Sequence, residues 1–149
     1  MTAADLTVPP GRAILDTNVL LAATDEARAE HRAALKILNS WPELYVSGQI
    51  LREYLSVATR PVDKNGLGLK TADAIGNVRA VLERATLLAD DSRVAHRLLN
   101  LLHDIDCCGK QVHDANIIAT MLVHGIDTVV SMNTADFARF ASHVSLVKL

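Results

Sequence analysis

Short apolar runs alternate with longer stretches of helical periodicity throughout this chain. The apolar runs predict five β-strands, at residues 12–15, 44–47, 85–90, 128–132 and 144–149. Apolar positions spaced three or four apart predict helices at residues 26–41, 49–60, 71–84, 92–105 and 112–124, with a short one at 134–140. This alternation of strands and helices is typical of an α/β fold with a central, mostly parallel sheet flanked by helices.

One loop interrupts the pattern. The segment "PVDKNGLGLK" at residues 61–70 contains Gly66 and Gly68, which permit many backbone conformations. Its charged residues Asp63 and Lys64 offer no apolar face to bury. We therefore expect the loop at residues 61–69 to be among the most mobile parts of the chain.

Length and composition predict one domain with an aliphatic core. The chain has 149 residues, of which 50% are hydrophobic and only 3% aromatic. Leucine, valine, isoleucine and alanine must then build the core, which suits parallel strands covered by helices. Residues 1–11, which include Pro9 and Pro10, are interpreted as an N-terminal tail, and residues 12–149 as the domain.

Charge and cysteine content narrow the function classes. The formal net charge is −2 and the isoelectric point is near 6.3, so the chain is not a strongly basic nucleic-acid binder. Cys107 and Cys108 are adjacent and lack the spacing of a zinc site. No apolar run approaches the length of a membrane span, and no apolar leader is visible. We expect a cytoplasmic protein without a membrane partner.

The candidate chemistry begins at Asp16, in the stretch "AILDTNVLLA". The carboxylate follows an apolar strand directly. It is suited to cap a following helix, because Asp accepts hydrogen bonds from the first backbone N–H groups. It also stands where ligands and catalytic groups gather in open α/β sheets, at the carboxyl end of a strand. The stretch alone does not decide between these two interpretations.

Three further acidic residues interrupt apolar segments. Glu53 lies in the predicted helix "QILREYLSVA", Asp114 opens the apolar helix "VHDANIIATMLV", and Asp136 follows the strand "TVVSM". Each is an ordinary residue for a helix start when taken alone. In a parallel sheet, however, all of these places and that of Asp16 fall at the carboxyl edge.

Four carboxylates at one edge would repel one another and raise their pKa values. The cations nearby in the sequence, Arg52 and Lys110, are too few to neutralise them. A hard divalent cation with oxygen ligands, Mg²⁺ or Mn²⁺, would do so. The pattern therefore indicates metal-assisted chemistry on a phosphate group.

Three segments carry a family resemblance: "ILDTNVLLA", "VSGQILREYLSVATRP" and "GKQVHDANIIATMLVHGIDTVVSMNTADF". Together they resemble a PIN-domain nuclease, specifically the VapC-like ribonuclease toxins, over about residues 12–148. The resemblance implies the PIN-like three-layer sandwich. The region at residues 61–90 matches no motif of the family. Ser131 stands where the family more often has threonine, a change that keeps the hydroxyl.

The resemblance also implies a site and partners. Its acidic quartet and polar supports fall on Asp16, Glu53, Asp114 and Asp136, and on Asn18, Ser131 and Asn133. Asp16 and Asp114 would be the principal ligands of Mg²⁺ or Mn²⁺, with Glu53 and Asp136 binding directly or through water. The implied substrate is RNA, cut by hydrolysis of a phosphodiester bond. Because the loop at residues 61–69 follows the predicted helix that carries Glu53, we expect it to lie near the substrate path. A homodimer and a cognate antitoxin are implied as well.

Two other functions remain open. An aspartyl-phosphate enzyme or receiver also places an aspartate after its first strand, but the phosphatase version has a second aspartate where this chain has Asn18. A non-catalytic α/β binding scaffold would retain the acidic residues only as helix caps. A scaffold of that kind should show little change in thermal stability when Mn²⁺ or Mg²⁺ is added.

Overall fold

The computed structural model describes residues 11–149, so the predicted tail lies, apart from Gly11, outside the described residues. Five strands form one sheet in the order β3-β2-β1-β4-β5, and every neighbouring pair is parallel. The strands are β1 (Arg12–Leu15), β2 (Glu43–Ser47), β3 (Ala85–Leu88), β4 (Thr128–Ser131) and β5 (Ser145–Lys148). The predicted fold class, a parallel sheet flanked by helices, is confirmed.

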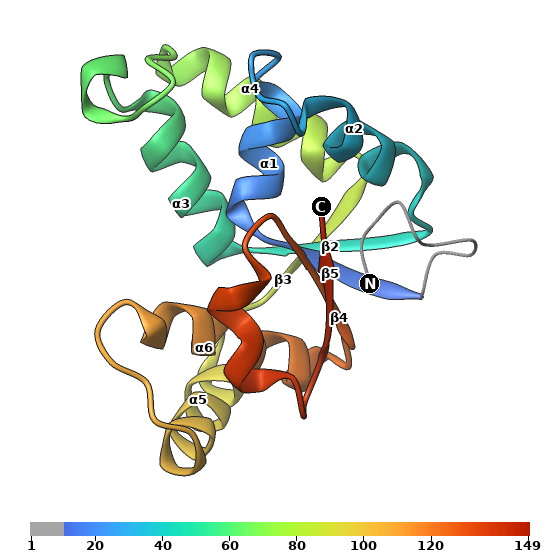
Figure 1. Cartoon of the computed structure of the whole chain (residues 1–149), viewed down its shortest axis with the longest axis vertical. Helices are drawn as coiled ribbons and strands as arrows, with labels where there is room; N and C mark the ends of the chain where they lie inside the picture. Colours follow the sequence, from blue (N-terminus) through green and yellow to red (C-terminus); the bar gives the residue numbers. More distant parts are fainter. Residues whose placement is uncertain (1–10) are drawn as a thin grey trace.

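Helices cover both faces of the sheet. They are α1 (Thr17–Thr24), α2 (His31–Ser40), α3 (Gly48–Thr59), α4 (Thr71–Leu82), α5 (Ser92–Asp104) and α6 (Gln111–His124), with short 3₁₀ helices η2 (Val62–Lys64) and η3 (Thr134–Phe140). Figure 1 shows α1 to α4 on one side of the sheet and α5 and α6 on the other. The central strands are therefore buried on both faces: all four residues of β4 are buried, and so are Ala13, Ile14 and Leu15 of β1.

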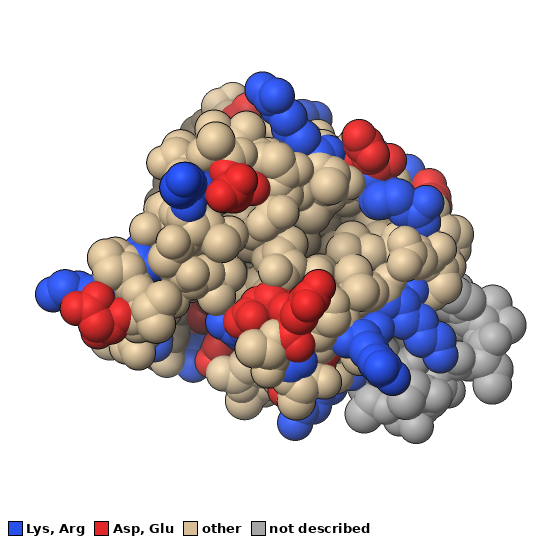
Figure 2. Space-filling model, turned by 90° about the horizontal axis from the view of Figure 1, so that it is seen from above, with Lys and Arg blue, Asp and Glu red and all other residues tan. Residues whose placement is uncertain are grey.

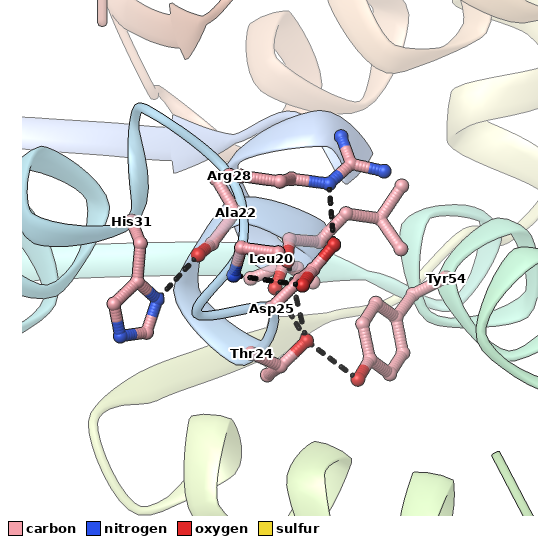
Figure 3. A network of polar contacts seen from close by, with 9 residues as sticks. Leu20, Ala22, Thr24, Asp25, Arg28, His31 and Tyr54 are labelled. Carbon is pink, nitrogen blue, oxygen red and sulfur yellow. Dashed lines mark hydrogen bonds and ion pairs between the residues drawn. The ribbon is translucent and has the colours of Figure 1, made fainter. Parts of the chain in front are cut away.

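The first predicted helix differs most from the structure. The sequence pattern predicts one helix over residues 26–41, whereas the structure has α1 before this range and starts α2 only at His31. Residues 25–30 form turns in place of helix (Figure 3). The Asp25 side chain stabilises them. Its carboxylate accepts hydrogen bonds from the backbone N–H of Ala27, at 3.1 Å, and from Arg28 Nε, at 3.3 Å, which holds a turn between the two helices.

The loop at residues 61–70 folds back onto the end of α3. The backbone N–H groups of Leu67, Gly68 and Leu69 donate to carbonyls of residues 57–60 at 2.8–3.1 Å. A Cβ at Gly66 would lie 1.9 Å from the carbonyl oxygen of Arg60, so glycine serves close packing here rather than freedom of motion. Leu67 and Leu69 also pack against the core. These contacts count against the expected mobility.

The loop also lies away from the carboxyl edge of the sheet. Figure 1 shows α3 running from the sheet to this loop, which stands at the far end of the helix. The structure therefore gives no support to the expectation that the loop borders the substrate path. Within residues 11–149, no helix is long and apolar enough to cross a membrane.

Candidate acidic site at the carboxyl edge of the sheet

Asp16 joins the end of β1 to the start of α1. Its backbone N–H donates to the carbonyl of Val130 at 3.0 Å, which continues the pairing with β4. Its Oδ1 accepts from the backbone N–H of Thr17 at 2.8 Å, so Asp16 is the N-cap of α1. Its Oδ2 accepts from the hydroxyl of Ser131, also at 2.8 Å. The cap interpretation is confirmed, and the same carboxylate is tied to the end of a second strand.

The predicted polar supports meet at the hydroxyl of Ser131. This fully buried hydroxyl donates to Asp16, and it accepts from Asn18 Nδ2 at 3.3 Å and from the backbone N–H of Asn133 at 3.0 Å. Asn18 Oδ1 accepts in turn from the backbone N–H of Met132 at 3.1 Å. Groups that follow β1 and groups at the end of β4 thus set the orientation of the Asp16 carboxylate together.

Glu53 approaches the same edge from the second turn of α3. Its Oε2 accepts from the hydroxyl of Thr17 at 2.8 Å, next to the Asp16 cap. Its Oε1 accepts from Gln49 Nε2, one helical turn earlier, at 3.0 Å. Glu53 therefore has neutral hydrogen-bond donors on both oxygens and is half-buried.

Asp114, in the first turn of α6, is strongly perturbed. Its pKa is raised from 3.8 to about 6, with burial as the largest cause. The negative charges of Asp136, Asp16 and Glu53 raise this pKa further. Lys110 lowers it, but is outweighed. The repulsion places Asp114 within electrostatic reach of the other three carboxylates.

The pKa of Asp16 is raised as well. Burial is the largest cause, and the hydrogen bonds from Ser131 and Thr17 oppose it by stabilising the charged form. The charges of Glu53 and Asp136 add to the rise. A buried carboxylate beside other carboxylates favours either a proton or a cation.

Asp136 is the most exposed member of the set. It lies in η3, just beyond β4, and its Oδ2 accepts from Asn133 Nδ2 at 3.1 Å. Asn133 thus links Asp136 to the Ser131 hydroxyl through its backbone N–H. The structure brings all four predicted carboxylates to one edge, with the three predicted supports among them.

The chemistry of these donors fits a hard divalent cation, because carboxylate oxygens are the ligands that Mg²⁺ and Mn²⁺ prefer. The hydrogen-bond donors to Asp16, Glu53 and Asp136 are all neutral. As the side chains stand, no three carboxylates, histidines or cysteines in residues 11–149 form a metal-binding cluster. The carboxylates therefore carry the negative charge that would attract a cation. Their side chains lie farther apart than the ligands of a single bound ion.

Three polar residues of this edge were not predicted from the sequence. Thr17 and Gln49 donate to Glu53, and Asn116 donates to Gln49 Oε1 at 2.9 Å. The spacing of four residues between Gln49 and Glu53 is a helical-neighbour signal that could have suggested their contact. Asn116 reaches Gln49 from another helix, and a single sequence gives no signal for a contact between two helices.

The comparisons with known proteins agree with this architecture. The model of the PIN domain family matches residues 13–142, which is most of the chain. The chain belongs to the PIN domain family. This membership decides against the aspartyl-phosphate alternative. No curated protein matches the sequence at a significant level.

Solved structures from toxin–antitoxin systems, VapC proteins among them, share the fold. VapBC2 from Rickettsia felis, bound to a DNA fragment from its promoter, aligns with a TM-score of 0.69 at 15% identity, covering 93% of this chain and 98% of that one. VapC20 from Mycobacterium tuberculosis, a toxin that cleaves the sarcin-ricin loop, aligns at 0.65 and 17%, covering 89% and 95%. A toxin–antitoxin complex from Klebsiella pneumoniae aligns at 0.60 and 24%, covering 85% and 90%.

Proposed function

We propose that this protein is a metal-dependent endoribonuclease that hydrolyses RNA phosphodiester bonds. The observation that carries the proposal is the acidic edge itself. Four carboxylates of a PIN domain act on one another there, and burial, together with the charges of the other three, raises the pKa of Asp114 to about 6. Burial and mutual repulsion make the negative charge of these carboxylates unfavourable, so the site is suited to bind a cation. A bound cation could in turn bind a phosphate group.

The distribution of charge supports a cation as the link to RNA. The net charge is −2. Figure 2 shows one face on which lysine and arginine side chains are interspersed with aspartate and glutamate, so the described part of that face has no continuous basic surface. An RNA phosphate would therefore be attracted to the acidic edge only when a metal ion bound by the carboxylates supplies positive charge.

The residues have separate tasks in this proposal. Asp16 and Asp114 would be the principal ligands of Mg²⁺ or Mn²⁺, and Glu53 and Asp136 would complete the site directly or through water. When bound, the ion would polarise the scissile phosphate and activate a water molecule. Ser131 holds Asp16 and Asn133 holds Asp136, each through a hydrogen bond to a single carboxylate oxygen. The second oxygen of Asp16 accepts from the backbone N–H of Thr17, so each oxygen of this carboxylate keeps a further lone pair with which it could bind an ion.

The partners are proposed from the relatives. The Rickettsia felis and Klebsiella pneumoniae structures are toxin–antitoxin complexes. By likeness, this chain would be a cytoplasmic toxin, homodimeric, and neutralised by a cognate antitoxin that blocks the acidic edge. Expression of the chain alone should arrest growth, and co-expression with a small DNA-binding protein encoded next to it should restore growth.

The decisive test uses the purified full chain with an RNA substrate. Cleavage should need Mg²⁺ or Mn²⁺ and stop on chelation, and Mn²⁺ should raise the midpoint of thermal unfolding. The alternative, a scaffold that keeps its acidic residues as caps, predicts no cleavage and almost no response to the metal. That outcome would overturn the proposal.

A further inference from the structure

We infer that Gln49 is a positioning residue that sets the orientation of Glu53 and its spacing from Asp114. The inference rests on the proposed ribonuclease function, since it concerns the same acidic edge. Gln49 is the second residue of α3, and its side chain is nearly buried, with 6% exposed. It carries no charge, and in the proposed function it contacts neither the metal ion nor the RNA. Its importance would lie in what it holds.

All three hydrogen-bonding positions observed for the Gln49 carboxamide point to this edge. One N–H of Nε2 donates to Glu53 Oε1 at 3.0 Å, and Nε2 also donates to the carbonyl of His113 at 2.9 Å. Its Oε1 accepts from Asn116 Nδ2 at 2.9 Å. Because both donors and the acceptor are used, the amide has one orientation that satisfies every partner.

These contacts join helices from opposite sides of the sheet. Gln49 and Glu53 lie on α3, whereas His113 and Asn116 lie on α6, and Figure 1 shows these helices on different faces. His113 immediately precedes Asp114. The carbonyl that Gln49 holds is therefore part of the backbone that carries the second proposed principal ligand. One buried amide connects the two acidic helix turns.

The chain of hydrogen bonds extends in both directions. Asn116 Nδ2 also donates to Asp90 Oδ2 at 2.9 Å, just beyond β3. At the other end, the Thr17 hydroxyl fixes the second oxygen of Glu53. Glu53 is thus held between α1 and α6, with Gln49 as the link. Loss of the amide would leave the carboxylate held on one oxygen only.

The test compares Gln49→Met with the wild-type chain. Methionine keeps about the same length and packing but has no N–H donor. Asn77→Leu is the matched control, because it replaces another amide on this side of the sheet, one that donates to the Tyr54 hydroxyl at 3.0 Å away from the acidic edge. Four quantities are measured for each protein: the free energy of unfolding, the Mn²⁺ concentration that half-saturates the thermal shift, and kcat and KM on RNA.

Gln49→Met should need about 10- to 100-fold more Mn²⁺ or lose kcat by a similar factor, as expected when a partner that orients a ligand is removed. The KM for RNA should change little. Asn77→Leu should keep wild-type Mn²⁺ binding and kcat even if it loses stability. Gln49→Glu should not restore function, since it presents an acceptor to the Glu53 carboxylate and the His113 carbonyl.

Wild-type Mn²⁺ binding and kcat in Gln49→Met would overturn the inference while leaving the ribonuclease proposal intact. Absence of metal-dependent cleavage in the wild-type chain would overturn the proposed function instead. If Gln49→Met does not fold, Asn116→Ala serves in its place. That variant removes the donor to Gln49 Oε1 and should give a smaller loss of the same kind, and unchanged Mn²⁺ binding would count against the inference.

Discussion

The two ends of α1 each carry an aspartate, and their surroundings differ. At the C-terminal end, Asp25 is paired with Arg28 at 3.3 Å and holds a turn (Figure 3). At the N-terminal end, Asp16 has only neutral donors among the described residues, and its pKa is raised by burial and further by the carboxylates of Glu53 and Asp136. The first carboxylate has its counter-ion in the protein. The second has no counter-ion within residues 11–149, so its charge is available to a ligand.

The comparison separates a structural aspartate from a candidate functional one. Both residues serve the ends of the same helix, so capping alone does not distinguish them. The distinguishing property is whether the negative charge is neutralised within the fold. Variants at the two ends should therefore differ in activity far more than in stability.

The largest effect is expected from Asp16→Asn. The change removes a proposed metal ligand and should abolish RNA cleavage, whereas the unfolding free energy of the metal-free protein should hold or rise because repulsion is relieved and asparagine still caps a helix. Chemical denaturation and a cleavage assay measure the two quantities. A protein that fails to fold, with no change in its response to metal, would make Asp16 a purely structural cap.

Asp114 provides a test by pH. Its pKa is raised from 3.8 to about 6 in the folded protein, so the folded state binds this proton more tightly than the unfolded state. The free energy of unfolding should therefore rise as pH falls from above 6 towards 4. Asp114→Asn should flatten this rise and remove nearly all cleavage. Saturating Mn²⁺ should also weaken the rise in the wild-type chain, since it stabilises the charged carboxylate.

Variants of Asp136 and Asn133 test which of the two residues binds the metal ion and which only orients a ligand. If Asp136 is a ligand, Asp136→Asn should raise the metal concentration needed for cleavage by about 10- to 100-fold, with partial rescue at high Mn²⁺. Asn133→Ala removes the donor to Asp136 and should lower activity even at saturating metal. Full activity of Asp136→Ala at limiting Mn²⁺ would leave a centre of only three carboxylates.

The smallest effect is expected at the other end of α1. Arg28→Ala breaks the ion pair with Asp25 and should lower the unfolding free energy by less than about 1 kcal/mol, as is usual for partly exposed pairs. Cleavage and Mn²⁺ binding should stay at the wild-type level. A large loss of cleavage in this variant would show that the two ends of α1 are not independent.

Much of the fold could be predicted from local patterns. Short apolar runs identified all five strands. The signal has its clearest physical reason in the central strands β1 and β4, which are buried on both faces and are therefore mostly apolar. The helix at residues 26–41 was predicted too long. Apolar periodicity gives no sign of a side chain that accepts a hydrogen bond from a backbone N–H and so stabilises a turn. Asp25 does so, and only the structure shows that it ends one helix before the next begins.

By itself, the sequence determined which carboxylates interrupt apolar segments, and parallel topology then brings Asp16, Glu53, Asp114 and Asp136 to one edge. The tertiary structure decided which side chains hold them. Ser131 reaches Asp16 across 115 positions of the chain, and Asn116 reaches Gln49 across 67. A single sequence records the spacing of neighbours along each element, whereas such contacts depend on how separate elements pack and on which buried polar groups need a partner.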